Sequence, residues 1–143
     1  MEIHKYFKEG KPLKIIRVDV HYIPGKDIKG ITITYQNMKQ CTHVADEVGK
    51  VETQSLVVKE GDYINGVTVS VGDNLLTYIW LETKDKGELK VNSGGSNCKK
   101  IVDPKSKNEP EVLGFYGKTC KSGVLTLGAY FCLHKQSDAD LFN

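Results

Sequence analysis

The strongest constraint on the fold is a strict alternation of apolar and polar residues between positions 60 and 72. In this segment, EGDYINGVTVSVG, three valines alternate with Thr68 and Ser70. A period of two turns one row of side chains toward a core and the other toward water, which is typical of a half-buried β-strand.

Similar patterns recur along the chain, and no continuous helical pattern competes with them. Residues 15–22 alternate cleanly and are followed by Pro24 and Gly25, a turn signal, so we expect a hairpin with residues 31–35. The polar stretch 36–50 has neither period. The other predicted strands are residues 51–59, 60–72, 75–83, 88–91, 112–116 and 124–134.

The last predicted strand is the longest, and one of its faces is apolar throughout. The residues expected to face the core together are Leu125, Leu127, Ala129, Phe131 and Leu133. Closely spaced strands separated by turns favour a closed or layered antiparallel architecture, in which few edges are exposed. The sequence therefore predicts an all-β protein.

Length and charge set limits on the organisation and the partners. A chain of 143 residues suits one domain, with an expected core at 14–134 and a polar tail at 135–143. Twenty Lys and Arg against eighteen Asp and Glu give a net charge of +2, and the basic residues are spread out. Because no aromatic residues interleave with the lysines around 99–107, we predict no nucleic-acid binding.

The chain has no stretch of ~20 apolar residues, so no membrane span is predicted. Its first residues, MEIHKYFKEGKPLK, lack the apolar segment of a secretory signal. We therefore expect a soluble protein, either cytoplasmic or secreted with its signal already removed.

The positions of the cysteines and the absence of catalytic motifs limit which disulfides, metal sites and reactions are expected. The four cysteines are Cys41, Cys98, Cys120 and Cys132. They permit three disulfide pairings and require none. His43 and His134 each follow a cysteine by two positions, but residues two apart on a strand are ~6.5–7 Å apart, too far for neighbouring metal ligands. No nucleophile elbow, phosphate-binding loop or HExxH motif occurs, so we predict no enzymatic activity, no metal and no cofactor.

Several segments occur in a recognisable order. They read GDYINGVTVSVGD, LLTYIWLETKDKG, a polar glycine-containing loop, EVLGFYGK and VLTLGAY. This order resembles that of the jacalin-related lectin family, which has a G-[DE]-Y-I strand, a strand ending in threonine before a short turn, a G-F-x-G strand end and a closing I-G-x-Y strand. The resemblance extends over residues 15–131.

The resemblance implies a particular fold. Members of this family form a β-prism of three antiparallel four-stranded sheets, each a Greek-key unit, around a pseudo-threefold axis. It also implies that certain glycines lie at bends or at sites of close backbone approach. These are Gly66, Gly72, Gly114, Gly117 and Gly128. Alternation alone equally fits a sandwich or a barrel of similar strand count.

The resemblance also implies a monosaccharide site at one end of the prism, formed by three loops. They are a glycine-rich loop near the N-terminus, a loop in the middle of the chain, and a G-x-x-x-D loop before the final strand. The aspartate would accept two charge-assisted hydrogen bonds from sugar hydroxyls. Here the third loop, GKTCKSGVLTLGAY, has no acidic residue. Its aspartate position falls on Leu125 counted back from Gly128, or on Val124 counted forward from Gly117, because this loop is one residue longer.

The remaining polar residues of the three loops are candidate ligand contacts. They are Gly10, Lys11, Asp73, Asn74, Tyr78, Lys118, Thr119, Lys121 and Ser122. The first loop is reduced to one glycine, and Asp73-Asn74 is more simply interpreted as a β-turn. The lysines of the third loop suit an anionic glycan or sulfate, although lysines on loops are usually just solvated.

Two functional hypotheses follow. The first is non-catalytic binding of a glycan or glycoprotein with altered or weakened sugar specificity. The second is a lectin fold that has lost its sugar and serves as a protein-interaction or assembly subunit, as the apolar residue in the third loop indicates. Lectin prisms often dimerise, so a homodimer fits both hypotheses, but the sequence does not indicate which sheet would form it.

Overall fold

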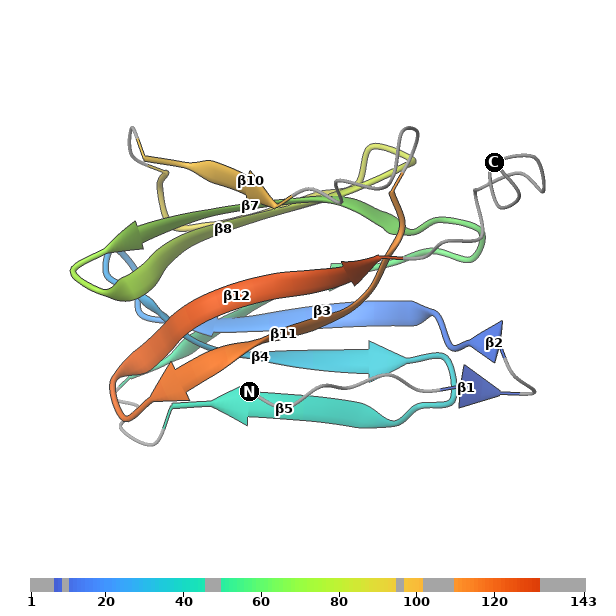
Figure 1. Ribbon diagram of the computed structural model, residues 1–143, viewed down its shortest axis with the longest axis horizontal. Helices are drawn as coiled ribbons and strands as arrows, with labels where there is room; N and C mark the ends of the chain where they lie inside the picture. Colours follow the sequence, from blue (N-terminus) through green and yellow to red (C-terminus); the bar gives the residue numbers. More distant parts are fainter. Residues whose placement is uncertain (1–6, 9–10, 46–49, 95–96, 102–109, 132–143) are drawn as a thin grey trace, which may run out of the picture.

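The computed structural model describes residues 7–8, 11–45, 50–94, 97–101 and 110–131 (Figure 1). The strands are β1 (Phe7–Lys8), β2 (Lys11–Pro12), β3 (Ile15–Tyr22), β4 (Ile28–Tyr35), β5 (Gln40–Val44), β6 (Glu52–Val57), β7 (Ile64–Gly72), β8 (Leu75–Thr83), β9 (Glu88–Val91), β10 (Lys99–Ile101), β11 (Val112–Cys120) and β12 (Gly123–Phe131). These ranges contain no helix, and therefore none long and apolar enough to cross a membrane.

The strands form three main sheets. Sheet I has the order β5-β4-β3-β6, sheet II has the order β10-β7-β8-β9, and sheet III consists of β11 and β12 among the described residues. Strands β1 and β2 pair as a separate short ribbon. In sheets I and II the fourth strand lies beside the first, which is the Greek-key order. All pairs are antiparallel.

Each main sheet packs against the other two. Strand β12 contacts β4 of sheet I and β8 of sheet II, and β4 also contacts β8 (Figure 1). The core fills the space between the three sheets, where alternate residues of every long strand turn inward. This three-sided arrangement confirms the predicted all-β prism of antiparallel Greek-key sheets.

Strands β3, β8 and β9 have the predicted bounds, whereas four strands were not predicted, namely the two-residue strands β1 and β2 and the longer β5 and β10. Strand β5 falls in the stretch 36–50, and β10 has only three residues. Both are edge strands that bury little, so neither produces a clear alternation. The predicted strand 31–35 begins earlier, at Ile28. The end of the last predicted strand, residues 132–134, lies outside the described residues.

The valine row of β7 is interrupted near its end. Val67 and Val69 are in the core as predicted, but Val71 is 48% exposed. The register between β7 and β8 shifts between Ser70 and Val71. The extra residue is Thr77 on β8, so the phase of β7 itself is unchanged, and Val71 is exposed because it lies near the end of the strand.

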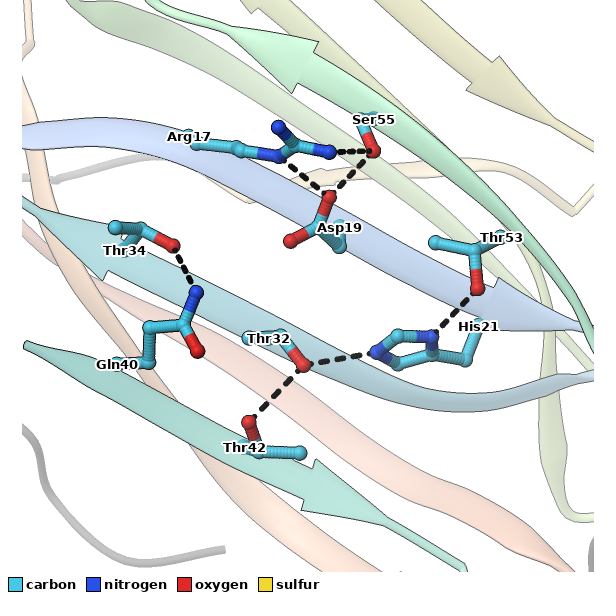
Figure 2. A network of polar contacts seen from close by, with 9 residues as sticks. All are labelled: Arg17, Asp19, His21, Thr32, Thr34, Gln40, Thr42, Thr53 and Ser55. Carbon is cyan, nitrogen blue, oxygen red and sulfur yellow. Dashed lines mark hydrogen bonds and ion pairs between the residues drawn. The ribbon is translucent and has the colours of Figure 1, made fainter.

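The outer face of sheet I carries a hydrogen-bonded polar network (Figure 2). Arg17 Nε donates to Asp19 Oδ1 at 2.8 Å, and Ser55 Oγ donates to the same oxygen. The ring of His21 bridges Thr53 Oγ1 at 2.9 Å and Thr32 Oγ1 at 2.8 Å. Because Thr32 donates its own proton to Thr42 Oγ1, it accepts from His21 Nε2–H. When the imidazole is neutral, Nδ1 therefore accepts from the Thr53 hydroxyl.

The pKa values of both titratable groups of this network, His21 and Asp19, are lower than usual. Burial lowers the pKa of His21 below 6.5, outweighing the opposing effect of the Asp19 carboxylate. Burial alone would raise the pKa of Asp19, but the hydrogen bonds from Ser55 and Arg17 bring it below 3.8. In both cases the unfolded chain binds more protons than the folded one, so acid favours unfolding.

We predict that stability declines as the pH falls below about 6.5, because the His21 contribution is complete above this value and is lost toward its folded pKa. Urea unfolding at pH 7.5 and pH 5.0, both above the Asp19 window, would measure the loss. In His21→Gln, whose side chain keeps a donor and an acceptor, the loss should be smaller. An equal loss in both proteins would contradict the assignment.

Candidate functional site

Three turns form one end of the prism, at the left in Figure 1, which we call the turn end. They are the β3–β4 turn at 23–27, the β7–β8 turn at 73–74 and the β11–β12 turn at 121–122. A Cβ on Gly123 would lie 3.0 Å from the Ile28 carbonyl oxygen and 3.4 Å from a Leu75 methyl group. The β11–β12 turn is therefore pressed against the starts of β4 and β8.

A buried lysine holds this turn down. Lys29 is buried, and its Nζ lies 2.8 Å from Asp27 Oδ1 and donates to the carbonyl oxygen of Ser122. A buried ammonium group is costly unless it is paired and hydrogen-bonded. The requirement to satisfy Lys29 therefore ties the β11–β12 turn to β4.

Asn92, at the end of β9, ties the β3–β4 turn to sheet II. Its Oδ1 accepts from the Gly25 N–H at 3.0 Å, and its Nδ2 donates to the Thr77 carbonyl oxygen at 3.1 Å. Sequence analysis missed both Lys29 and Asn92. The only sequence signals are a lysine inside a β-branched strand and an asparagine among turn formers.

Two of the three predicted loops meet at the turn end. Asp73 and Asn74 form the β7–β8 turn, both are exposed, and Asn74 has a positive φ of 68°. The interpretation of this pair as a β-turn is confirmed. Lys121 and Ser122 are exposed in the β11–β12 turn, and the side chains at the turn end are thus mainly polar.

The other candidates of the middle and third loops lie farther along the strands. Thr119 is half-buried on β11, and exposed Lys118 donates its backbone N–H to Thr126 Oγ1 at 3.0 Å. Tyr78 is buried, which raises its pKa above 10.0. A Cβ on Gly94 would lie 2.9 Å from the Tyr78 ring, so the β9–β10 loop covers this side chain.

The N-terminal loop is not brought to the turn end. Gly10 lies outside the described residues, and Lys11 belongs to β2. Nearby, the Lys14 N–H donates to Gln36 Oε1 at 2.9 Å, and the Gln36 N–H donates to the Lys14 carbonyl oxygen at 2.9 Å. Gln36 follows β4 at the end opposite the turn end. Strand β3, about 25 Å long, therefore separates Lys11 from the other two loops.

The position of the family aspartate is apolar on either count, but one expectation about it was wrong. Val124 is 2% exposed and belongs to the core, whereas Leu125 is only half-buried and does not share a row with Leu127. The register passes from Lys118 opposite Thr126 to Thr119 opposite Val124. Leu125 is thus the extra residue of a β-bulge, which reverses the expected inward side.

No cluster of metal ligands occurs in the described part of the chain. Cys41 is in the core and His43 is half-buried beside it on β5. The second Cys-x-His pair, Cys132 and His134, lies outside the described residues.

Comparisons with known proteins agree with this architecture. The family model for the jacalin-like lectin domain matches residues 5–130. No curated protein sequence matches the chain. A prostate-specific WGA16 glycoprotein lectin is 16% identical, with a TM-score of 0.71 over 84% of this chain and 83% of that one.

Two further lectin structures are similar to this chain. Malaysian banana lectin is 20% identical, with a TM-score of 0.65 over 83% of each chain. Jacalin bound to melibiose, Gal-α(1-6)-Glc, is 14% identical, with a TM-score of 0.68 over 84% of this chain and 92% of that one. At these identities the structural matches show the shared fold. Because the family model spans most of the sequence, the chain belongs to the family of jacalin-like lectin domains.

Proposed function

We propose that this domain binds glycans non-covalently at the turn end, without catalysis, and with a specificity altered by the missing carboxylate. The jacalin-like lectin fold suggests carbohydrate binding. The main observation behind the proposal is that the β7–β8 and β11–β12 turns lie side by side. Both turns present exposed polar side chains. Lys29 and Asn92 hold neighbouring backbone in place, so little conformational entropy is lost when a ligand binds.

The apolar residues at 124 and 125 support a change in specificity. A hydrogen bond to a charged group contributes about 1.5–3 kcal/mol, so each bond lost weakens binding of a neutral sugar about tenfold or more. Exposed Lys118 and Lys121 add positive charge on β11 and its turn, against the exposed carboxylate of Asp73, whereas the Asp27 carboxylate is paired with Lys29. We therefore expect sulfated or acidic saccharides to bind better than neutral ones.

A glycan array followed by calorimetric titration tests this proposal. We expect saturable binding that Asp73→Ala or Lys121→Ala weakens about threefold or more, since each removes a charged hydrogen-bonding group. Asp85→Ala and Lys84→Ala are matched controls, because both residues are exposed in the turn at the opposite end of β8. Silence across neutral and acidic sugars would contradict glycan binding.

A second candidate function is supported by the inward position of Val124. A lectin fold without its acidic ligand can act as a protein-interaction or assembly subunit. In that case, cross-linking or co-purification should capture a protein partner that competing sugars do not displace. Displacement by a simple sugar would instead favour the glycan proposal.

A further inference from the structure

Strands β11 and β12 of sheet III (Figure 1) present an aromatic side chain on their outer face. Tyr116 is 44% exposed, and it is the one exposed aromatic residue among those whose burial the structure describes. The preceding residue, Phe115, is in the core, so Tyr116 points away from it. The outward residues face one another across the two strands as three pairs: Gly114 with Tyr130, Tyr116 with Gly128, and Lys118 with Thr126.

The glycine opposite Tyr116 lets the tyrosine ring lie down on the sheet. A Cβ on Gly128 would lie 2.3 Å from Tyr116 Cζ, 2.5 Å from its hydroxyl oxygen and 2.7 Å from Cε1. These atoms belong to the far half of the ring, so the ring reaches across to β12 and covers the Gly128 backbone. Aromatic cover of a strand glycine in this way is stabilising. One face of the ring is therefore packed on the sheet, and the other faces solvent.

Tyr130 holds the Tyr116 ring from the side. The two ring centroids are 5.0 Å apart and the ring planes are tilted by 50°, so the rings form a corner. Tilted aromatic pairs at this separation attract each other. Because contacts with Gly128 and Tyr130 already fix the ring, little conformational entropy is lost when a ligand stacks on it.

The next pair along the strands supplies polar groups. Lys118 and Thr126 are both exposed, and each lies two residues, or roughly 7 Å, along its strand from the pair Tyr116 and Gly128. Thr126 Oγ1 accepts from the Lys118 backbone N–H at 3.0 Å, which orients the hydroxyl. Among the described residues the structure shows no acceptor for the Thr126 hydroxyl proton. This hydroxyl and the Lys118 ammonium group can therefore donate to a ligand.

A flat aromatic ring with hydrogen-bond donors beside it fits the chemistry of a pyranose. A pyranose carries C–H groups on one face and hydroxyls around its rim, and the electron-rich face of an aromatic ring attracts such C–H groups. We propose that the outer face of sheet III is a second saccharide site, separate from the turn end. One pyranose stacks on Tyr116 there, while Lys118 and Thr126 bind its hydroxyls.

A saccharide fits this face better than a protein partner does. An aromatic side chain buries about 150–250 Å², a fraction of the about 800 Å² that each partner contributes to a standard protein interface. Lysine is also depleted at the centres of such interfaces, whereas Lys118 lies beside the aromatic pair. A contact centred on one ring predicts weak binding, with a dissociation constant on the order of 1 mM.

An NMR titration of the full chain tests the proposal, because backbone amide signals report each site separately. The probes are the methyl α- and β-pyranosides of galactose, glucose and mannose, each added to about 50 mM. We expect at least one of them to shift the amide signals of Gly114, Lys118 and Gly128 saturably. In Tyr116→Ala the dissociation constant from these shifts should rise about fivefold or more, whereas Tyr116→Phe keeps the ring and should bind nearly as well.

Two further variants complete the test. Lys118→Ala removes a donor without altering the aromatic rings and should raise the same dissociation constant about threefold. Met38→Ala is the matched control, since Met38 is an apolar side chain, 71% exposed in the β4–β5 turn, and its loss should leave the constant unchanged. Urea unfolding confirms that each variant folds.

The amide signals of Asp73 and Asn74 separate this proposal from glycan binding at the turn end. Shifts confined to these two residues would overturn the sheet III site and support the turn-end site. Shifts confined to the sheet III signals would support the second site and contradict binding at the turn end. The proposal would also be overturned if Tyr116→Ala left the sheet III shifts unchanged, or if no pyranoside shifted these signals at the highest concentration.

Discussion

Replacing Phe115 by alanine is expected to lower the free energy of unfolding by about 3–5 kcal/mol. Phe115 lies on β11, is 1% exposed, and is one of the largest side chains that are fully buried. It belongs to the core cluster between the three sheets. Its removal costs both the transfer of the ring from water and the cavity left behind. Urea unfolding followed by circular dichroism would measure the change.

Tyr116→Ala is the matched control for this substitution. Tyr116 is the next residue on β11 but points outward, is 44% exposed, and packs against Tyr130 with ring centroids 5.0 Å apart and ring planes tilted by 50°. Losing such a pair costs about 0.5–1.5 kcal/mol. If the two variants lost equal stability, the assignment of inner and outer faces on β11 would be wrong.

Gly30→Ala should destabilise the fold by about 1–3 kcal/mol or more, because the added methyl group has no room. A Cβ on Gly30 would lie 2.4 Å from the His43 carbonyl oxygen and 2.6 Å from Val44 Cα. Both are backbone atoms of β5, so relief requires β4 and β5 to separate. The same unfolding measurement, with the wild-type chain as reference, would give the difference.

Gly66→Ala tests whether the destabilisation at Gly30 arises because the added methyl group meets backbone atoms and not side-chain atoms. Gly66 is also a strand glycine, but its added Cβ would meet Glu82 Oε1 at 3.0 Å, the end of a flexible side chain. The carboxylate can swing away, and the approach of 3.3 Å to Glu82 Cβ needs a shift of only a few tenths of an ångström, so we expect a change within about 1 kcal/mol. A larger loss at Gly66 than at Gly30 would refute this explanation.

The parts of the fold that were predictable are those whose pattern is imposed locally. Strands β3 and β8 each bury one face along their length, so their alternation marks their bounds. Strands β5 and β10 lie at sheet edges and bury little, and no period identifies them. The bulge at Leu125 could not be predicted from the sequence either, because a shift in register depends on the partner strand rather than on the residue itself.

The residues of the candidate site likewise include some that local sequence preferences predict and some that they do not. Asp73 and Asn74 favour a turn through their own backbone preferences, and the turn is there. Lys29 contacts a residue 93 positions away in the sequence, and Asn92 contacts one 67 positions away. Such contacts exist only after the sheets have assembled, so neither role could be predicted from neighbouring residues.

The inward Val124 makes an acidic side chain at this position hard to accommodate. A single codon change to aspartate would put a carboxylate into the dry interior, where an unpaired charge is strongly destabilising. Val124 shares the inner row with Leu127 across the bulge, so only a different register between β11 and β12 would turn this position outward. As long as β12 keeps this bulge, a carboxylate at position 124 would therefore face the core and not a ligand.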